Sequence, residues 1–309
     1  MQDVIPLGDR WELTLGGRYD DVRAAAGRVK DPLSGTATAM ADSWAAFTGQ
    51  SRLLYSVDEE RHWQLFGGVG QSFRAPNLSD MTRYDIARSN ELETPSANLA
   101  AEHFLTYEVG VKADYARWRG ELSLFRTEIQ NMIVRAPTGK VIGGLLEVMK
   151  KNAGRGYVQG IEIGGEFRAT AEWTLFANAT WLDGEVDGYP SSAAVKQREP
   201  LSRMMPATVN SGWRFAPLCW NQKFFLEASC TVAAGQGDMS AADRADTQRC
   251  PPNGTPGYEV FNLRAGYNIT PDIIITAAVD NILNRSYRIV GSGANEPGRN
   301  LLLGFAAKF

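Results

Sequence analysis

Apolar and polar residues alternate with a period of two along almost the whole chain. The last nine residues, "LLLGFAAKF", place five side chains on one apolar face: Leu301, Leu303, Phe305, Ala307 and Phe309. The segments "LTYEVGVKA" and "WTLFANATW" repeat this alternation inside the chain, and helical periodicity is hard to find. Because successive side chains of a strand point to opposite faces, the pattern predicts an all-β protein whose strands each have one apolar face.

The segments between the alternating stretches fall into two length classes. Short, turn-like links are expected at 58–62, 115–118, 170–173, 216–221 and 269–272. Long links are expected at 74–102, 136–155, 187–202, 234–256 and 289–297. Short turns on one rim and long loops on the other are typical of a transmembrane β-barrel.

The chain is therefore predicted to form an antiparallel transmembrane β-barrel of about twelve strands. We expect these strands near residues 11–24, 44–57, 63–73, 103–114, 119–134, 156–169, 173–186, 203–216, 222–235, 257–268, 273–288 and 298–309. Residues 1–5 resemble the tail of a further strand. The tryptophans support this interpretation, because five of them lie at or beside the short turns, as in an interfacial aromatic girdle: Trp11, Trp63, Trp118, Trp173 and Trp220.

Composition narrows the function classes. The 309 residues are 44% hydrophobic and 22% charged, with a net charge of −3, so the chain has no basic excess that would indicate a nucleic-acid partner. Three cysteines and two histidines are too few for a disulfide scaffold or a zinc site, and we expect neither a metal nor a cofactor. Glu102 and His103 are adjacent on a predicted strand and point to opposite faces, so they do not form a catalytic pair. We expect that the chain is not an enzyme.

Several segments resemble TonB-dependent outer-membrane receptors, the ligand-gated importers of Gram-negative bacteria. "GVGQSFRAPNLSDM" (68–81) is similar to the strand that leads into the family's Phe-Arg-Ala-Pro box. Residues 93–133 resemble the segment that follows, with Asn98, Leu99 and Glu102 kept and the preceding Asn-Pro changed to "TPSA". The hairpin at 156–185 and the terminal strands at 257–309 are also similar to the family.

The resemblance implies a single domain over residues 1–309 that forms the C-terminal part of a receptor barrel in the Gram-negative outer membrane. It implies uptake of an iron chelate of the ferric siderophore type. The family's plug domain and N-terminal strands are not recognisable in the sequence, so we expect a truncated form that does not transport alone. The implied partners are outer-membrane lipid, the barrel-assembly machinery and the iron chelate, with TonB only in a full-length form.

The candidate site residues lie near the long-loop rim and at the C-terminus. Arginine and tyrosine suit an anionic, aromatic chelate, so we expect ligand contacts from Arg74, Arg83, Tyr84 and Arg88. Haem-importing members of the family place a histidine between the two conserved boxes, and the resemblance adds His103, which comes just after that interval, as a further candidate. In this family the last strand ends in an aromatic that the assembly machinery reads, which assigns the signal to Gly304, Phe305, Ala307 and Phe309. Cys230 and Cys250 are candidates for a disulfide in an oxidising compartment. A haem-uptake receptor and a small passive porin remain as alternatives.

The ends of the chain raise the question of closure. An open sheet edge presents unpaired backbone groups, and each costs several kcal/mol in hydrocarbon, on the order of tens of kcal/mol for a whole edge. We therefore expect the strand near 11–24 to pair with the strand near 298–309 and close a small barrel.

Overall fold

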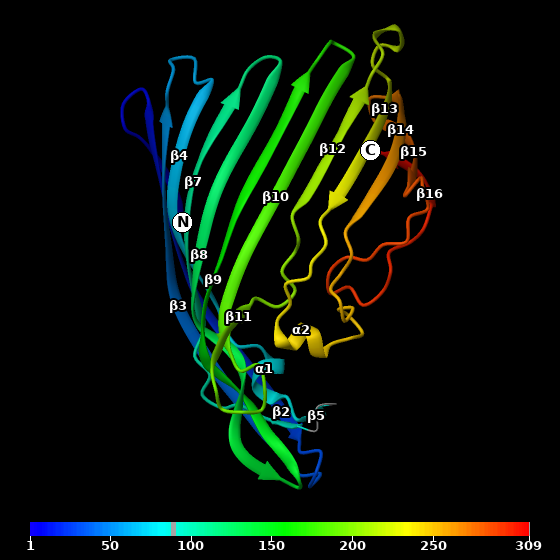
Figure 1. The fold of residues 1–309 in the computed structure, drawn as a ribbon. Coiled ribbons are helices and arrows are strands. Elements are labelled where there is room, and N and C mark those ends of the chain that lie inside the picture. Colours follow the sequence, from blue (N-terminus) through cyan, green and yellow to red (C-terminus); the bar gives the residue numbers. More distant parts are fainter. Residues whose placement is uncertain (88–90, 309) are drawn as a thin grey trace.

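The computed structural model describes residues 1–87 and 91–308, and these form a curved sheet with the shape of an open trough (Figure 1). Sixteen strands belong to this sheet, and neighbouring strands are antiparallel except where β6 runs parallel to β9. Thirteen strands cross the sheet in chain order: β1 (Gln2–Pro6), β2 (Trp11–Lys30), β3 (Ala37–Ser56), β4 (Trp63–Arg74), β7 (Glu102–Asp114), β8 (Trp118–Ile142), β9 (Leu145–Arg168), β10 (Trp173–Gly188), β12 (Thr208–Phe215), β13 (Phe224–Ala233), β14 (Tyr258–Thr270), β15 (Ile273–Asp280) and β16 (Asn300–Ala307).

The remaining elements are short and belong to the connections. Three strands lie off the main path of the sheet: β5 (Asp85–Ala87), β6 (Glu91–Thr94) and β11 (Gln197–Pro200). The helices are α1 (Leu78–Thr82), the 3₁₀ turn η1 (Leu218–Trp220) and α2 (Ala241–Ala245). Among the described residues, no helix has the length and apolar character needed to cross a membrane.

The strand registers separate two faces of the sheet. One row of partners across five strands consists of Leu53, Gly67, Val109, Leu124 and Ile161. The next row consists of Arg52, Gly68, Glu108, Phe125 and Gly160, on the face that also contains Ser123 and Glu162. We call the faces that these two rows define the apolar face and the polar face. Large apolar side chains on the apolar face are exposed, which is the arrangement expected of a wall that faces lipid.

The predicted sorting of the connections is confirmed. Because consecutive strands on the main path are antiparallel neighbours, the five short links all lie at one edge of the sheet. In Figure 1 these turns are at the top, and α1, α2, β5 and β11 are near the opposite edge, which we call the long-loop edge. One expected long loop is wrong. Residues 136–155 belong mostly to β8 and β9, which continue to a tight turn at Gly143 and Gly144, both with positive φ.

The expected closure and strand count are not borne out. In the described residues, no strand pairing joins β16 to β1 or β2, so the sheet stays open. Residues 2–6 pair with Glu12–Gly16 of β2 and thus occupy part of the edge that was expected to meet the C-terminal strand. Twelve strands of the main path match the predicted ones, but β1 and the three short strands raise the total to sixteen.

Candidate ligand-binding site at the long-loop edge

Arg74 is fixed in an ion-pair cluster where β4 ends. Its Nε donates to Glu102 Oε2 over 2.5 Å, and its Nη1 donates to Asp80 Oδ2 over 2.7 Å. The other Glu102 oxygen accepts the Ile133 backbone N–H at 2.7 Å. Asp80 also belongs to the capping box with Asn77 that starts α1. Arg74 is therefore held by two carboxylates of the protein, and its structural role is to tie the start of the long connection to β7 and β8.

Arg83 and Tyr84 follow α1 and have different surroundings. Arg83 Nε lies 3.1 Å from Glu93 Oε2, and its Nη2 lies 3.4 Å from Asp85 Oδ2. Burial raises the pKa of Tyr84 above its ordinary value, and the negative charge of Asp31, with which Tyr84 forms a hydrogen bond, raises it further. Arg88 was also a predicted ligand residue, and it lies outside the described residues.

His103 lies on the apolar face, opposite to the expected location. Its cross-strand partners are Phe73 and Gln130, and it shares its face with Leu105 and Tyr107 further along β7. Glu102 points the other way, into the Arg74 cluster. Successive side chains of a strand point to opposite faces, so His103 points away from the face on which Glu102 contacts Arg74. From the apolar face His103 cannot reach a ligand that lies above the polar face.

A cavity of about 540 Å³ lies between the β2–β3 hairpin and the segment around α1. We call it the hairpin cavity. Its lining includes Tyr84 and four residues that the sequence analysis did not single out: Asp31, Met40, Asp42 and Met81. Thr36, Thr38, Pro95 and Asn98 also contribute to it. Arginine and lysine are not among its described lining residues, so its charged groups are carboxylates.

The segment around α1 is held against the hairpin by a small apolar core. Met81, Leu99 and Ile133 form a buried cluster, against which Ala24 and Trp44 pack from the polar face of β2 and β3. Trp44 Nε1 donates to the Leu99 carbonyl oxygen over 2.6 Å. The two sides of the hairpin cavity, which are the β2–β3 hairpin and the segment around α1, are thus held together by packing between residues far apart in the sequence. No local motif in the sequence indicates this packing.

Comparison with known proteins decides the family. The family model described as "TonB dependent receptor-like, beta-barrel" matches residues 1–282. The chain belongs to the TonB-dependent receptor β-barrel family. The probable TonB-dependent siderophore receptor PiuA of Acinetobacter baumannii is 24% identical over 295 residues, which cover 92% of this chain and 36% of that protein.

One further curated protein and one solved structure are similar to this chain. The ferric enterobactin receptor PirA of Pseudomonas aeruginosa is 24% identical over 266 residues, which cover 78% of this chain and 34% of that protein. The solved structure of the copper transporter OprC shares the fold with a TM-score of 0.73 and 15% identity, over 100% of this chain and 46% of that one. The chain spans about a third of the length of the curated relatives it matches.

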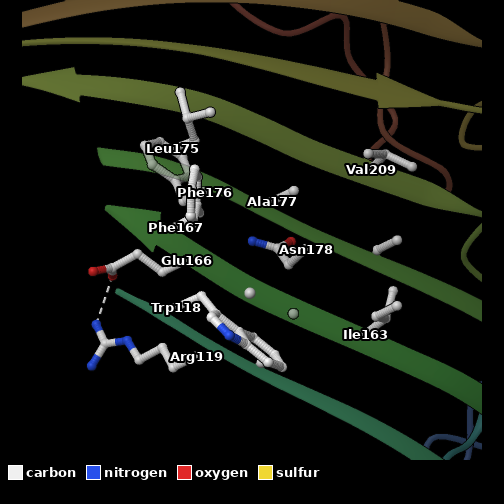
Figure 2. A pocket seen from close by; sticks show the side chains of 14 residues that line it. Trp118, Arg119, Ile163, Glu166, Phe167, Leu175, Phe176, Ala177, Asn178 and Val209 are labelled. Carbon is white, nitrogen blue, oxygen red and sulfur yellow. Dashed lines mark hydrogen bonds and ion pairs between the residues drawn. The ribbon is translucent and has the colours of Figure 1, made fainter. Parts of the chain in front are cut away.

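The apolar face of this receptor-family sheet contains a groove of about 470 Å³ near the short-turn edge. Figure 2 shows its lining, in which Trp118, Phe167, Leu175 and Val209 surround small residues. Gly120 and Gly165 are cross-strand partners, and Ala177 pairs with Gly165 on the next strand, so the surface dips where side chains are small. Arg119 and Glu166, which form an ion pair at 2.6 Å, are the charged residues of the lining. The groove suits contact with apolar chains rather than recognition of a charged chelate.

The short-turn edge contains the predicted aromatic girdle in part. Trp63 and Trp118 contact edge to face with ring centroids 5.6 Å apart, and Tyr115 stacks on Trp118 at 5.1 Å. Beside them, Asp58, Glu60 and His62 bring metal-donor atoms within 4.8 Å of one another. Both Asp58 oxygens already accept backbone N–H groups, from His62 and Trp63. This cluster is accounted for as the hydrogen bonding of a tight turn.

The predicted disulfide is not formed in the structure, where all three cysteines are free thiols. Cys230 lies on the apolar face of β13, opposite Ser211 and Phe261. Cys250 is buried in the long connection after α2, where its backbone N–H bonds to the Asp246 carbonyl oxygen. The two thiols are in separate environments, because the alternation of side chains along β13 directs Cys230 to the apolar face, whereas Cys250 is buried in the long connection.

The predicted assembly signal lies on the last strand. Phe305 is exposed on the apolar face together with Leu301 and Leu303, and Ala307 continues this row. Gly304 points to the other face, where a Cβ would approach Thr276 Oγ1 to 2.5 Å. Phe309 lies outside the described residues. The alternation predicted for the end of the chain is confirmed up to Ala307.

Proposed function

We propose that this chain forms part of the wall of an outer-membrane receptor that takes up an iron chelate of the ferric siderophore type. The observation that carries the proposal is the structured surface at the long-loop edge. There the Arg74 cluster and the bond from Trp44 to Leu99 hold the segment around α1 against the polar face. The hairpin cavity that results has a volume typical of small-molecule sites.

The exposed apolar face supports the membrane part of the proposal. Side chains such as Val109, Ile163 and Leu303 project from β7, β9 and β16, and each is at least half exposed. Exposed apolar area of this extent is unfavourable in water and favourable against hydrocarbon. Outer-membrane lipid is therefore a proposed partner of this face, and the barrel-assembly machinery is a proposed partner of the last strand. Family members work with TonB, and we extend that step only to a full-length form of this receptor.

The two alternatives have weaker support. Haem capture requires an axial ligand near the polar face, but His103 lies on the apolar face and Tyr84 is engaged with Asp31. A small passive porin of about twelve strands would close on itself, and no pairing between the first and last described strands supports such a closure. A relative named as a ferric enterobactin receptor also favours the siderophore type.

The test is a binding titration of the chain refolded in detergent micelles. A ferric tricatecholate, a ferric trihydroxamate and haem are each added while quenching of tryptophan fluorescence is followed, with the iron-free chelators as controls. We expect saturable quenching with at least one ferric chelate and much weaker quenching with its iron-free form. Binding of haem alone would overturn the siderophore assignment in favour of the haem alternative.

A further inference from the structure

The hairpin cavity differs in charge from the site that the arginines of the long connection suggest. Arg74 and Arg83 are both paired with carboxylates of the protein, so neither offers a free cation to an anionic chelate. The charged groups that line the cavity are instead Asp31 and Asp42. An anionic ligand would be repelled by this lining, whereas a cationic group would be attracted to it.

The carboxylates of Asp31 and Asp42 accept different numbers of hydrogen bonds from the protein. Asp31 is occupied by its own turn, because its oxygens accept the Leu33 N–H at 2.8 Å and the Ser34 hydroxyl at 2.5 Å. Asp42 accepts only the adjacent Ser43 N–H, at 2.8 Å, among the bonds of the described residues. A carboxylate has about four acceptor positions. Asp42 therefore presents unused acceptor capacity to the cavity, and the Asp31–Tyr84 pair supplies a second polar wall.

The other walls are apolar and flexible. Met40 lies on the same face of β3 as Asp42, two residues away, and the cavity also has Met81 and Pro95 in its lining. Methionine adapts its shape to irregular apolar groups. An alkyl chain that ends in an ammonium group matches this combination, because its methylenes contact the methionines and its N–H groups donate to the carboxylates.

We infer that the hairpin cavity binds a protonated primary amine carried by the iron chelate, and this inference rests on the proposed function. Asp42 is the main acceptor of the ammonium, and Tyr84 and Asp31 complete its polar surroundings. The receptor would then select among ferric chelates of similar size by a positively charged side arm. The chelated iron itself lies outside the cavity in this arrangement.

The test compares two probes that differ only in the amine. One is a linear ferric trihydroxamate with a terminal primary amine, and the other is the same chelate with that amine acetylated. Binding to the full chain in detergent micelles is measured by isothermal titration calorimetry. We expect the amine form to bind about tenfold more tightly, because acetylation removes the charge-assisted hydrogen bonds. Asp42→Asn should abolish this preference, because the amine probe then loses its charged acceptor.

Asp9→Asn is the matched control. Asp9 is exposed in the turn between β1 and β2 at the opposite edge, so its substitution removes one negative charge without touching the cavity. The preference should persist in this variant. Equal affinity of the wild-type chain for both probes would overturn the amine site and leave chelate binding intact. Failure of the correctly folded chain to bind either probe or any other ferric chelate would overturn the proposed function instead.

Discussion

Arg74, the last residue of β4, donates its Nε–H to Oε2 of Glu102, the first residue of β7, over 2.5 Å. The two residues are cross-strand partners on the polar face, and 27 residues of the long connection lie between them. The Glu102 side chain is only 5% exposed, whereas that of Arg74 is 39% exposed. The pair therefore clamps both ends of the connection that forms one wall of the hairpin cavity.

Replacement of Glu102 should destabilise this clamp. Glu102→Ala leaves the Ile133 N–H without its acceptor and Arg74 with Asp80 alone. We expect the free energy of unfolding to fall by about 2–3 kcal/mol, below the value for a fully buried pair because water reaches Arg74. Urea unfolding in detergent measures the change. Glu121→Gln, which removes an exposed pair with Lys112, is the control and should cost less than about 0.5 kcal/mol.

A second prediction concerns the contact of Phe66 with Gly110. A Cβ at Gly110 would overlap the Phe66 ring and the Leu122 carbonyl oxygen. Phe66 is buried and is also covered by the Arg52 guanidinium, 4.2 Å from the ring centre, and the Leu122 carbonyl is a backbone group that cannot rotate away. Gly110→Ala should therefore destabilise the sheet by about 1–3 kcal/mol. At Gly164 the nearest atom is 3.9 Å from the added Cβ, so Gly164→Ala should leave the urea midpoint nearly unchanged.

The strands and the side chains on each of their faces could be predicted from the sequence, but the hairpin cavity could not. Alternation in segments such as 103–114 depends only on neighbours along the chain, so the apolar face could be predicted there. The same alternation assigns His103 to the face of Leu105 and Tyr107, and only the family resemblance made it a ligand candidate. Asp31 and Asp42 could not be found in this way. They come together with Tyr84 through packing between residues more than forty positions apart, and β2 and β3 extend beyond the strand ends expected at 24 and 44.

The turn at the tip of the β2–β3 hairpin should depend on acid. The Ser34 hydroxyl and then the Leu33 N–H hold the pKa of Asp31 below its ordinary value. Since the folded pKa is lower than the unfolded one, the stabilisation is complete above the unfolded pKa of about 4 and is lost as the pH falls through the folded value. The protection factors of the amides of residues 31–36, which compare the observed exchange rate with the intrinsic rate at each pH, should therefore fall below pH 4. Asp31→Asn should already exchange faster at pH 7 and lose this acid dependence.

Asn281 should control the connection between β15 and β16. Its side chain is buried, and its Nδ2 donates to the Arg285 and Pro297 carbonyl oxygens at 2.8 and 3.1 Å, while its Oδ1 accepts the Arg285 N–H at 2.7 Å. Asn281→Ala removes all three bonds of a buried side chain, but Arg285 and Pro297 are exposed and water can partly replace the lost partner, so we expect a loss of about 1–3 kcal/mol. Limited proteolysis should then cut within 285–297. Asn253, which is exposed in another long connection, provides the control substitution Asn253→Ala, and equal cleavage of the two variants would contradict the prediction.

The adjacent residues Leu302 and Leu303 test which face of the sheet contacts lipid. Leu303 pairs with Ala277 on the apolar face and is 80% exposed, whereas Leu302 pairs with Ala278 on the polar face and is 44% exposed. An arginine on a lipid-facing wall costs about 2–4 kcal/mol near the middle of the bilayer, because the charge must leave water. An arginine on the polar face keeps its hydration. Leu303→Arg should therefore reduce the yield of folded, heat-modifiable protein in lipid vesicles severalfold, and Leu302→Arg should reduce it much less. If the apolar face were in contact with water instead of lipid, arginine at the more exposed Leu303 would be tolerated at least as well as arginine at Leu302. Equal yields of the two variants in vesicles would therefore show that the apolar face does not lie against lipid.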